Sequence, residues 1–135
     1  MTPALDHLGI AVRDLDAAAR VYAALGLKAE GREVVEQEQV EVVMLPLEAG
    51  RIELLQPTSP ASSVARFLAK RGEGLHHIAL RVDDLAAAVE RIEAQGMRLV
   101  TPAIQTGAGG HRYVFVHPAS AGGVLIELVE GGAHK

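Results

Sequence analysis

An internal repeat constrains the fold of this chain more than any other feature of its sequence. Residues 5–26 align with residues 75–96 without a gap, and nine of the aligned positions are identical. Further along, residues 52–54 align with residues 126–128 once an insertion of four residues is allowed. A repeat of this kind indicates one structural module used twice in succession.

Each copy of the repeat is expected to form a strand, a helix and then three more strands. The apolar runs 7–12 and 77–82 are typical of strands, and Asp14 and Asp84 are expected to cap the Ala-rich helices that follow. The remaining strands are expected at 28–36, 40–45 and 51–56 in the first copy and at 97–100, 112–117 and 124–130 in the second. The sequence therefore predicts an α+β fold of two tandem βαβββ modules.

The two modules are expected to form a single domain over residues 1–135. The first spans about residues 5–57, the second about residues 75–130, and a linking helix is expected at about 61–71. A length of 135 residues suits one domain and is short for two. One module alone would also leave an apolar face of its small sheet uncovered.

Composition and charge exclude several classes of function. A net charge of −4 and an aromatic content of 3% disfavour nucleic-acid binding, which needs a basic surface and often aromatic stacking platforms. The chain has no cysteine, which excludes disulfides and thiolate chemistry. Its apolar stretches are shorter than the roughly 20 residues of a membrane-spanning helix, and its first residues lack the pattern of a signal peptide. We therefore expect a cytoplasmic protein that binds neither nucleic acid nor membranes.

Four polar residues recur at matched positions of the two modules. His7 and His77 lie on the first strands, and Glu53 and Glu127 lie on the last. Two imidazoles and two carboxylates are suitable ligands for Co²⁺, Zn²⁺, Ni²⁺, Mn²⁺ or Fe²⁺. Any one of these residues alone is better explained as a hydrogen-bonded histidine or a solvent-facing glutamate. Recurrence of all four favours a metal site.

The segments around these residues have a characteristic sequence. They read HLGIAV at 7–12, GLHHIALRVDDL at 74–85, GGHR at 109–112, and HP at 117–118 followed by GGVLIEL at 122–128. Over residues 5–130 the chain resembles the methylmalonyl-CoA epimerases. These belong to the vicinal oxygen chelate superfamily, together with glyoxalase I, the extradiol dioxygenases and the bleomycin-resistance proteins.

This resemblance implies a curved sheet around one central metal ion, with Co²⁺ the expected cofactor. His7, His77 and Glu127 match the family's ligands, and Glu53 falls where the family has a fourth ligand, Gln in some members and Glu in others. The resemblance also implies an acyl-CoA substrate and a homodimer. His76 has the opposite strand parity to His77 and is expected to face away from the metal.

The implied reaction is the interconversion of (2R)- and (2S)-methylmalonyl-CoA, or of a close 2-carboxyacyl-CoA, by α-proton abstraction through a metal-stabilised enolate. Inversion requires an acid/base group on each face of the carbon. The family pattern assigns one role to Glu127 and the other to a third-strand glutamate, for which an ungapped alignment selects Glu41. Matching Val40 to the valine of the family's Gln-Gly-Val motif instead places Val42 at the position of that third-strand glutamate. A solvated edge strand is a further explanation of Glu41.

Basic residues that could contact the substrate are less well defined. The basic residues of the linking helix either bind the phosphates of coenzyme A or are exposed to solvent. A further arginine, after the glycine-rich turn, could contact the substrate. These residues are Arg66, Lys70, Arg71 and Arg112.

Two other functions use the same fold. Glyoxalase I also has two His and two Glu ligands and also moves a proton next to a carbonyl, but the HP and GGVLIEL segments favour the epimerase. A metal-free protein that sequesters a ligand is the second alternative, and it predicts degraded ligand positions, whereas here all four are intact.

Overall fold

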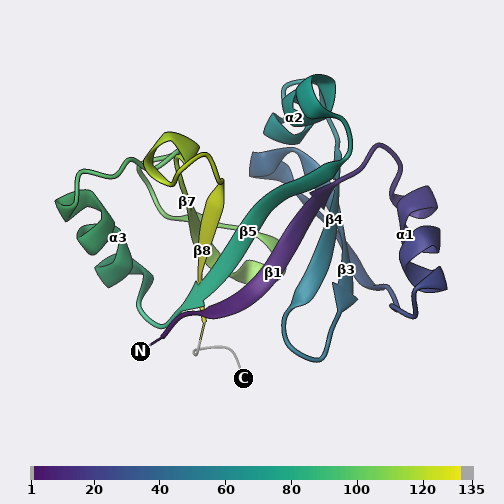
Figure 1. The fold of residues 1–135 in the computed structure, drawn as a ribbon, viewed down its shortest axis with the longest axis horizontal. Coiled ribbons are helices and arrows are strands. Elements are labelled where there is room, and N and C mark those ends of the chain that lie inside the picture. Colours follow the sequence, from purple (N-terminus) through teal and green to yellow (C-terminus); the bar gives the residue numbers. More distant parts are fainter. Residues whose placement is uncertain (1, 132–135) are drawn as a thin grey trace. The chain divides into compact units, whose positions relative to one another are not determined.

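The computed structural model describes residues 2–131, and Figure 1 shows the order of their elements. The strands are β1 (Ala4–Ala11), β2 (Glu30–Val35), β3 (Val40–Pro46), β4 (Arg51–Pro57), β5 (Gly74–Val82), β6 (Gln105–Thr106), β7 (Arg112–Val116) and β8 (Ile126–Glu130). The helices are α1 (Leu15–Ala24), α2 (Ser63–Arg71) and α3 (Leu85–Ala94), with short 3₁₀ helices η1 (Glu36–Glu38), η2 (Ala108–Gly110) and η3 (Pro118–Ser120). The predicted α+β class, with a βαβββ series repeated, is confirmed.

The residues pack into two compact units that correspond closely to the two modules. One unit is His7–His76, and the other joins Met1–Asp6 to His77–Lys135, of which the structure describes 2–6 and 77–131. Strand order is β2-β3-β4-β1 in the first unit and β5-β8-β7-β6 in the second. In both, the first and last strands of the module pair in parallel and the other pairs are antiparallel. The two units therefore place matched residues at matched positions in a sheet.

Helix α1 packs on one face of the first unit, beside β3 and β4 in Figure 1. Its Leu15 is fully buried against Val43 and Leu54. The helix begins at Asp14, whose carboxylate accepts hydrogen bonds from the N–H groups of Asp16 and Ala17, as the sequence predicted. The opposite face of β3 and β4 carries Glu53 together with the buried Val42 and Leu55.

Helix α3 packs in the same way in the second unit, where Leu85 is fully buried against Val114 and Leu128. Asp84 caps it by accepting a hydrogen bond of 3.0 Å from the N–H of Ala87. In both units, a side chain of the last strand also accepts a hydrogen bond from the first N–H of the helix. These acceptors are Gln56 for Leu15 and Glu130 for Leu85.

Replacing Asp84 by alanine is expected to lower the free energy of unfolding by about 1 kcal/mol, because an orphan N–H of α3 loses its acceptor. Urea denaturation measures this change. The neighbouring Asp83 is exposed, and Asp83→Ala serves as the matched control, with a change near zero. Equal stability of the two variants would show that the cap contributes nothing.

The strand predicted at 97–100 is wrong. Only an isolated bridge between Leu99 and Val116 forms there, with two hydrogen bonds of 2.8 Å, from the N–H of Val100 to the carbonyl of Phe115 and from the N–H of His117 to the carbonyl of Arg98. Pro102 follows and lacks the N–H that a longer ladder requires. Pairing with β7 resumes only at β6, two residues long.

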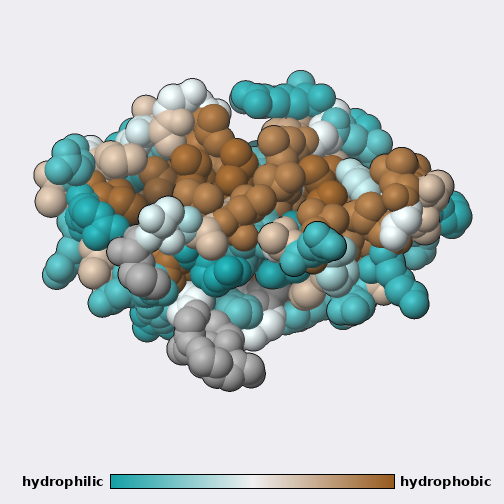
Figure 2. All heavy atoms as spheres, turned by 60° about the horizontal axis from the view of Figure 1, so that its bottom comes forward, coloured by the Kyte–Doolittle hydropathy of each residue, from teal (hydrophilic) through white to brown (hydrophobic). Residues whose placement is uncertain are grey.

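No helix among the described residues is long and apolar enough to span a membrane. Apolar side chains are nevertheless exposed, including those of Val21, Leu25 and Val34, and Figure 2 shows apolar surface in brown. Apolar atoms normally contribute roughly half of a folded protein's surface, so exposure at single positions is ordinary.

Candidate metal-binding residues

The first unit contains a buried pair formed by His7 of β1 and Glu53 of β4. Their exposed fractions are only 4% each, and His7 Nε2 lies 3.4 Å from Glu53 Oε1. The parallel register places Glu53 opposite Gly9, two residues from His7 and on the same face. Because Gly9 has no side chain, the imidazole and the carboxylate meet diagonally across the two strands.

The second unit contains the matched pair, His77 of β5 and Glu127 of β8. Both are buried, and His77 Nε2 lies 3.1 Å from Glu127 Oε1. Here the residue opposite Glu127 is Ala79, which is again small. The ring of Phe115 lies edge-on to the imidazole of His77, with 5.3 Å between centroids, and restricts its rotation. The duplicated sequence thus produces the same arrangement twice.

The donor atoms of each pair fit a divalent cation. Two ligand atoms that each lie ~2.1 Å from one ion are separated by roughly 3 Å, which is close to the separations of 3.4 and 3.1 Å in the two pairs. A buried carboxylate also needs a compensating positive charge; Glu53 has the guanidinium of Arg51 at 2.6 Å, and a bound ion would supply positive charge to both pairs. Each pair can therefore provide one nitrogen and one oxygen ligand.

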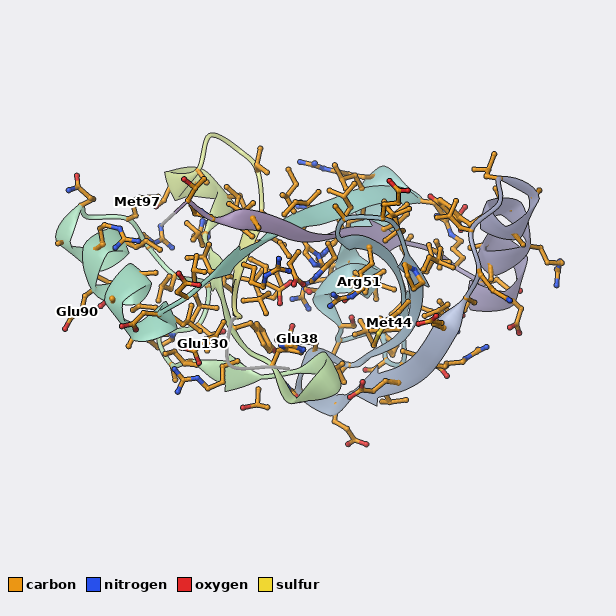
Figure 3. The ribbon with its side chains drawn as sticks, turned by 90° about the horizontal axis from the view of Figure 1, so that it is seen from below. Glu38, Met44, Arg51, Glu90, Met97 and Glu130 are labelled. Atoms are coloured by element: carbon orange, nitrogen blue, oxygen red, sulfur yellow. The ribbon has the colours of Figure 1, made fainter. Side chains whose placement is uncertain are left out.

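Arg51 contacts this region, although the sequence analysis did not identify it. Its Nε donates a hydrogen bond of 2.8 Å to Glu53 Oε2, and its Nη2 lies 2.6 Å from the same oxygen. Figure 3 shows Arg51 near Met44, and the strand register places both residues on the face of Glu53. The sequence contained a signal for this contact, because Arg51 and Glu53 are two residues apart on one strand and residues so spaced share a face.

Glu41 lies on the opposite face of the β3–β4 pair from Glu53. In the register Glu41 faces Gln56, whereas Met44 faces Glu53, and side chains alternate along a strand. Arg32 Nε donates a hydrogen bond of 2.8 Å to Glu41 Oε2, and this bond, more than the one to Asp16, raises the pKa of Arg32. The hypothesis that Glu41 is the second acid/base group is therefore corrected: its side chain belongs to the face that α1 covers.

The alternative alignment, with Val42 at the family's third-strand position, agrees with the backbone. Gln39 then corresponds to the glycine of the Gln-Gly-Val motif, and its φ of +56° is left-handed, a conformation that glycine adopts most readily. Val42 faces Leu55 in the register and so shares the face of Glu53. A valine cannot transfer a proton, so a second acid/base group must come from another residue.

Replacing Glu41 by glutamine is accordingly expected to leave turnover within roughly threefold of the unchanged protein, because the substitution removes only a partly exposed ion pair with Arg32. Steady-state kinetics with the substrate proposed below measures this. A loss of a hundredfold or more, roughly the effect of removing an acid/base group, would reinstate Glu41.

Three of the four basic residues considered as coenzyme A contacts have partners within the chain. Arg66 Nη1 donates a hydrogen bond of 2.7 Å to the carbonyl of Ala61, and the Arg71 guanidinium lies over the ring of Phe67. Arg112 forms an ion pair of 3.0 Å with Glu130. These contacts are sufficient to explain the three arginines.

Comparison with known proteins gives a consistent family. A model described as the Glyoxalase/Bleomycin resistance protein/Dioxygenase superfamily matches residues 6–115. The ethylmalonyl-CoA/methylmalonyl-CoA epimerase of Cereibacter sphaeroides is 37% identical over 127 residues, which are 92% of this chain and 95% of that protein.

Solved structures agree. The methylmalonyl-CoA epimerase of Mycobacterium tuberculosis is 42% identical with a TM-score of 0.91, and the match covers 96% of this chain and 88% of that one. A variant of the Streptomyces coelicolor epimerase in complex with 2-nitronate-propionyl-CoA is 39% identical with a TM-score of 0.91, over 96% of this chain and 94% of the other. The chain therefore belongs to the methylmalonyl-CoA epimerase family of the glyoxalase/bleomycin resistance protein/dioxygenase superfamily.

Proposed function

We propose that this protein epimerises a 2-carboxyacyl-CoA thioester, with methylmalonyl-CoA as the first choice, and that His7, Glu53, His77 and Glu127 together hold one divalent ion. The observation that carries the proposal is the recurrence of one buried His–Glu pair in each unit, at matched positions of the repeat. The names of the relatives supply the substrate class.

A bound ion, for which Co²⁺ is our first choice, would supply positive charge beside the thioester oxygen on which negative charge develops. The side chains of the protein hold the ion and orient the ligands. Imidazoles must be neutral to serve as ligands, and the edge-on ring of Phe115 keeps His77 turned toward Glu127. The four residues are only between 4% and 8% exposed, so charge interactions among their side chains are screened little by water.

We further propose that Glu53 and Glu127 are the two acid/base groups. Inversion requires that one group removes the α-proton and that another returns a proton to the opposite face. Glu127 keeps the role that the family pattern assigns to it, and Glu53 takes the role first assigned to Glu41. Two carboxylates at matched positions of a duplicated fold are suited to a reaction that treats the two faces of one carbon alike.

Incubation of the Co²⁺-loaded protein with (2R)- or (2S)-methylmalonyl-CoA in D₂O tests this function. We expect deuterium at the α-carbon together with inversion, and ethylmalonyl-CoA in a parallel assay defines the range of acyl groups. Absence of exchange with both thioesters would contradict the proposal. Conversion of the hemithioacetal of methylglyoxal and glutathione instead would identify a glyoxalase I.

A further inference from the structure

The two carboxylates of the matched pairs differ in one respect. Arg51 holds Glu53 through two nitrogens, Nε at 2.8 Å and Nη2 at 2.6 Å, and both contacts are to Oε2. The other oxygen, Oε1, is the one nearest His7 Nε2. Arg51 and His7 therefore lie at opposite oxygens of the same carboxylate.

This arginine is not duplicated in the repeat. The spacing that aligns Glu53 with Glu127 aligns Arg51 with Leu125, an aliphatic residue. The side chain of Arg51 is 25% exposed and that of Glu53 only 6%, so a partly exposed guanidinium contacts a buried carboxylate. Because this arginine occurs in just one of the two modules, its role is expected to relate to a difference between them.

The difference concerns charge at the fourth ligand position. Glu53 carries one negative charge as a ligand, whereas an amide in its place would carry none. The guanidinium of Arg51 cancels that charge at contact distance. The pair Glu53 and Arg51 is thus equivalent in charge to a single glutamine.

We infer that Arg51 is a positioning residue that sets the charge of the ion site. This inference rests on the proposed function. By holding Oε2, Arg51 leaves Oε1 as the ligand atom, and by cancelling the charge of Glu53 it keeps the loaded site net positive. A net positive site attracts a substrate that is an anion and becomes more negative as its α-proton leaves.

The inference predicts opposite effects of two single substitutions. Arg51→Met leaves an uncompensated carboxylate, so Co²⁺ is expected to bind roughly tenfold more tightly and an anionic ligand roughly tenfold more weakly. Glu53→Gln leaves an uncompensated guanidinium, and Co²⁺ is expected to bind roughly tenfold more weakly. In the double variant both constants are expected to return to within roughly threefold of the unchanged protein. Arg51→Lys keeps the charge and is expected to behave as the unchanged protein.

Isothermal titration of each folded variant with Co²⁺ alone measures the first constant. Titration of the Co²⁺-loaded forms with 2-nitronate-propionyl-CoA measures the second. Circular dichroism selects the conditions under which each variant is folded. Arg32→Met is the matched control, because it removes another Arg–Glu pair, on the opposite face of β3 and β4, and it is expected to change neither constant.

The possible outcomes separate this inference from the proposed function. Weaker Co²⁺ binding by Arg51→Met that Glu53→Gln does not reverse would overturn the charge assignment and leave Arg51 as a residue that only orients Glu53. Unchanged constants in Arg51→Met would also overturn it. If the unchanged protein binds no Co²⁺, the metal site itself is wrong and the assignment of Arg51 falls with it.

Discussion

Replacing His77 by alanine is expected to remove stoichiometric Co²⁺ binding and to lower kcat at least roughly a thousandfold. The ion contributes several kcal/mol to stabilising negative charge on the substrate, and each ~1.4 kcal/mol corresponds to tenfold in rate. Without the imidazole, Glu127 also loses the group 3.1 Å from its Oε1. Metal analysis of the purified protein and the D₂O assay measure the two effects.

His76→Ala is the matched control. His76 precedes His77 on β5, has the opposite strand parity, and packs edge-on against Phe67 of α2 with 5.1 Å between ring centroids. Its removal is expected to leave Co²⁺ stoichiometry unchanged. Full Co²⁺ binding in His77→Ala, or loss of the ion in His76→Ala, would show that the wrong histidine had been assigned.

Replacing Glu127 by glutamine is expected to separate proton exchange from inversion. If Glu53 and Glu127 serve opposite faces of the α-carbon, the variant retains one base and still exchanges the α-proton of one stereoisomer with D₂O. Interconversion of the isomers is expected to fall by roughly 10² to 10⁴, the usual contribution of an acid/base group. Saturating Co²⁺ compensates for weaker ion binding.

Glu53→Gln provides the reciprocal test, with exchange of the other stereoisomer. Chiral analysis of the recovered thioester, together with its deuterium content, distinguishes the two activities. Rapid interconversion by Glu53→Gln would remove Glu53 from the acid/base pair and restrict it to a ligand. Loss of exchange from both stereoisomers in either variant would contradict the assignment of separate faces.

Local sequence signals predicted most of the fold. The aspartates that cap α1 and α3, and the repeat that aligns His7 with His77, could be read because capping and strand alternation depend on near neighbours in the chain. The strand expected at 97–100 forms only an isolated bridge, and the reason is also local. Its apolar residues favour a strand, but Pro102 just beyond it cannot donate a hydrogen bond to a ladder.

The sequence by itself determined the repeated βαβββ order, and it identified Glu53 and Glu127 together with the histidine that lies beside each. It could not decide which residues of β3 share the face of Glu53, because this depends on the register of one strand against another, and a shift of one residue reverses every side chain. Only the tertiary structure placed Glu41 on the α1 side and Val42 on the side of Glu53. It also revealed the contact from Arg51 to one oxygen of Glu53, since the direction of a long side chain depends on the partners that surround it.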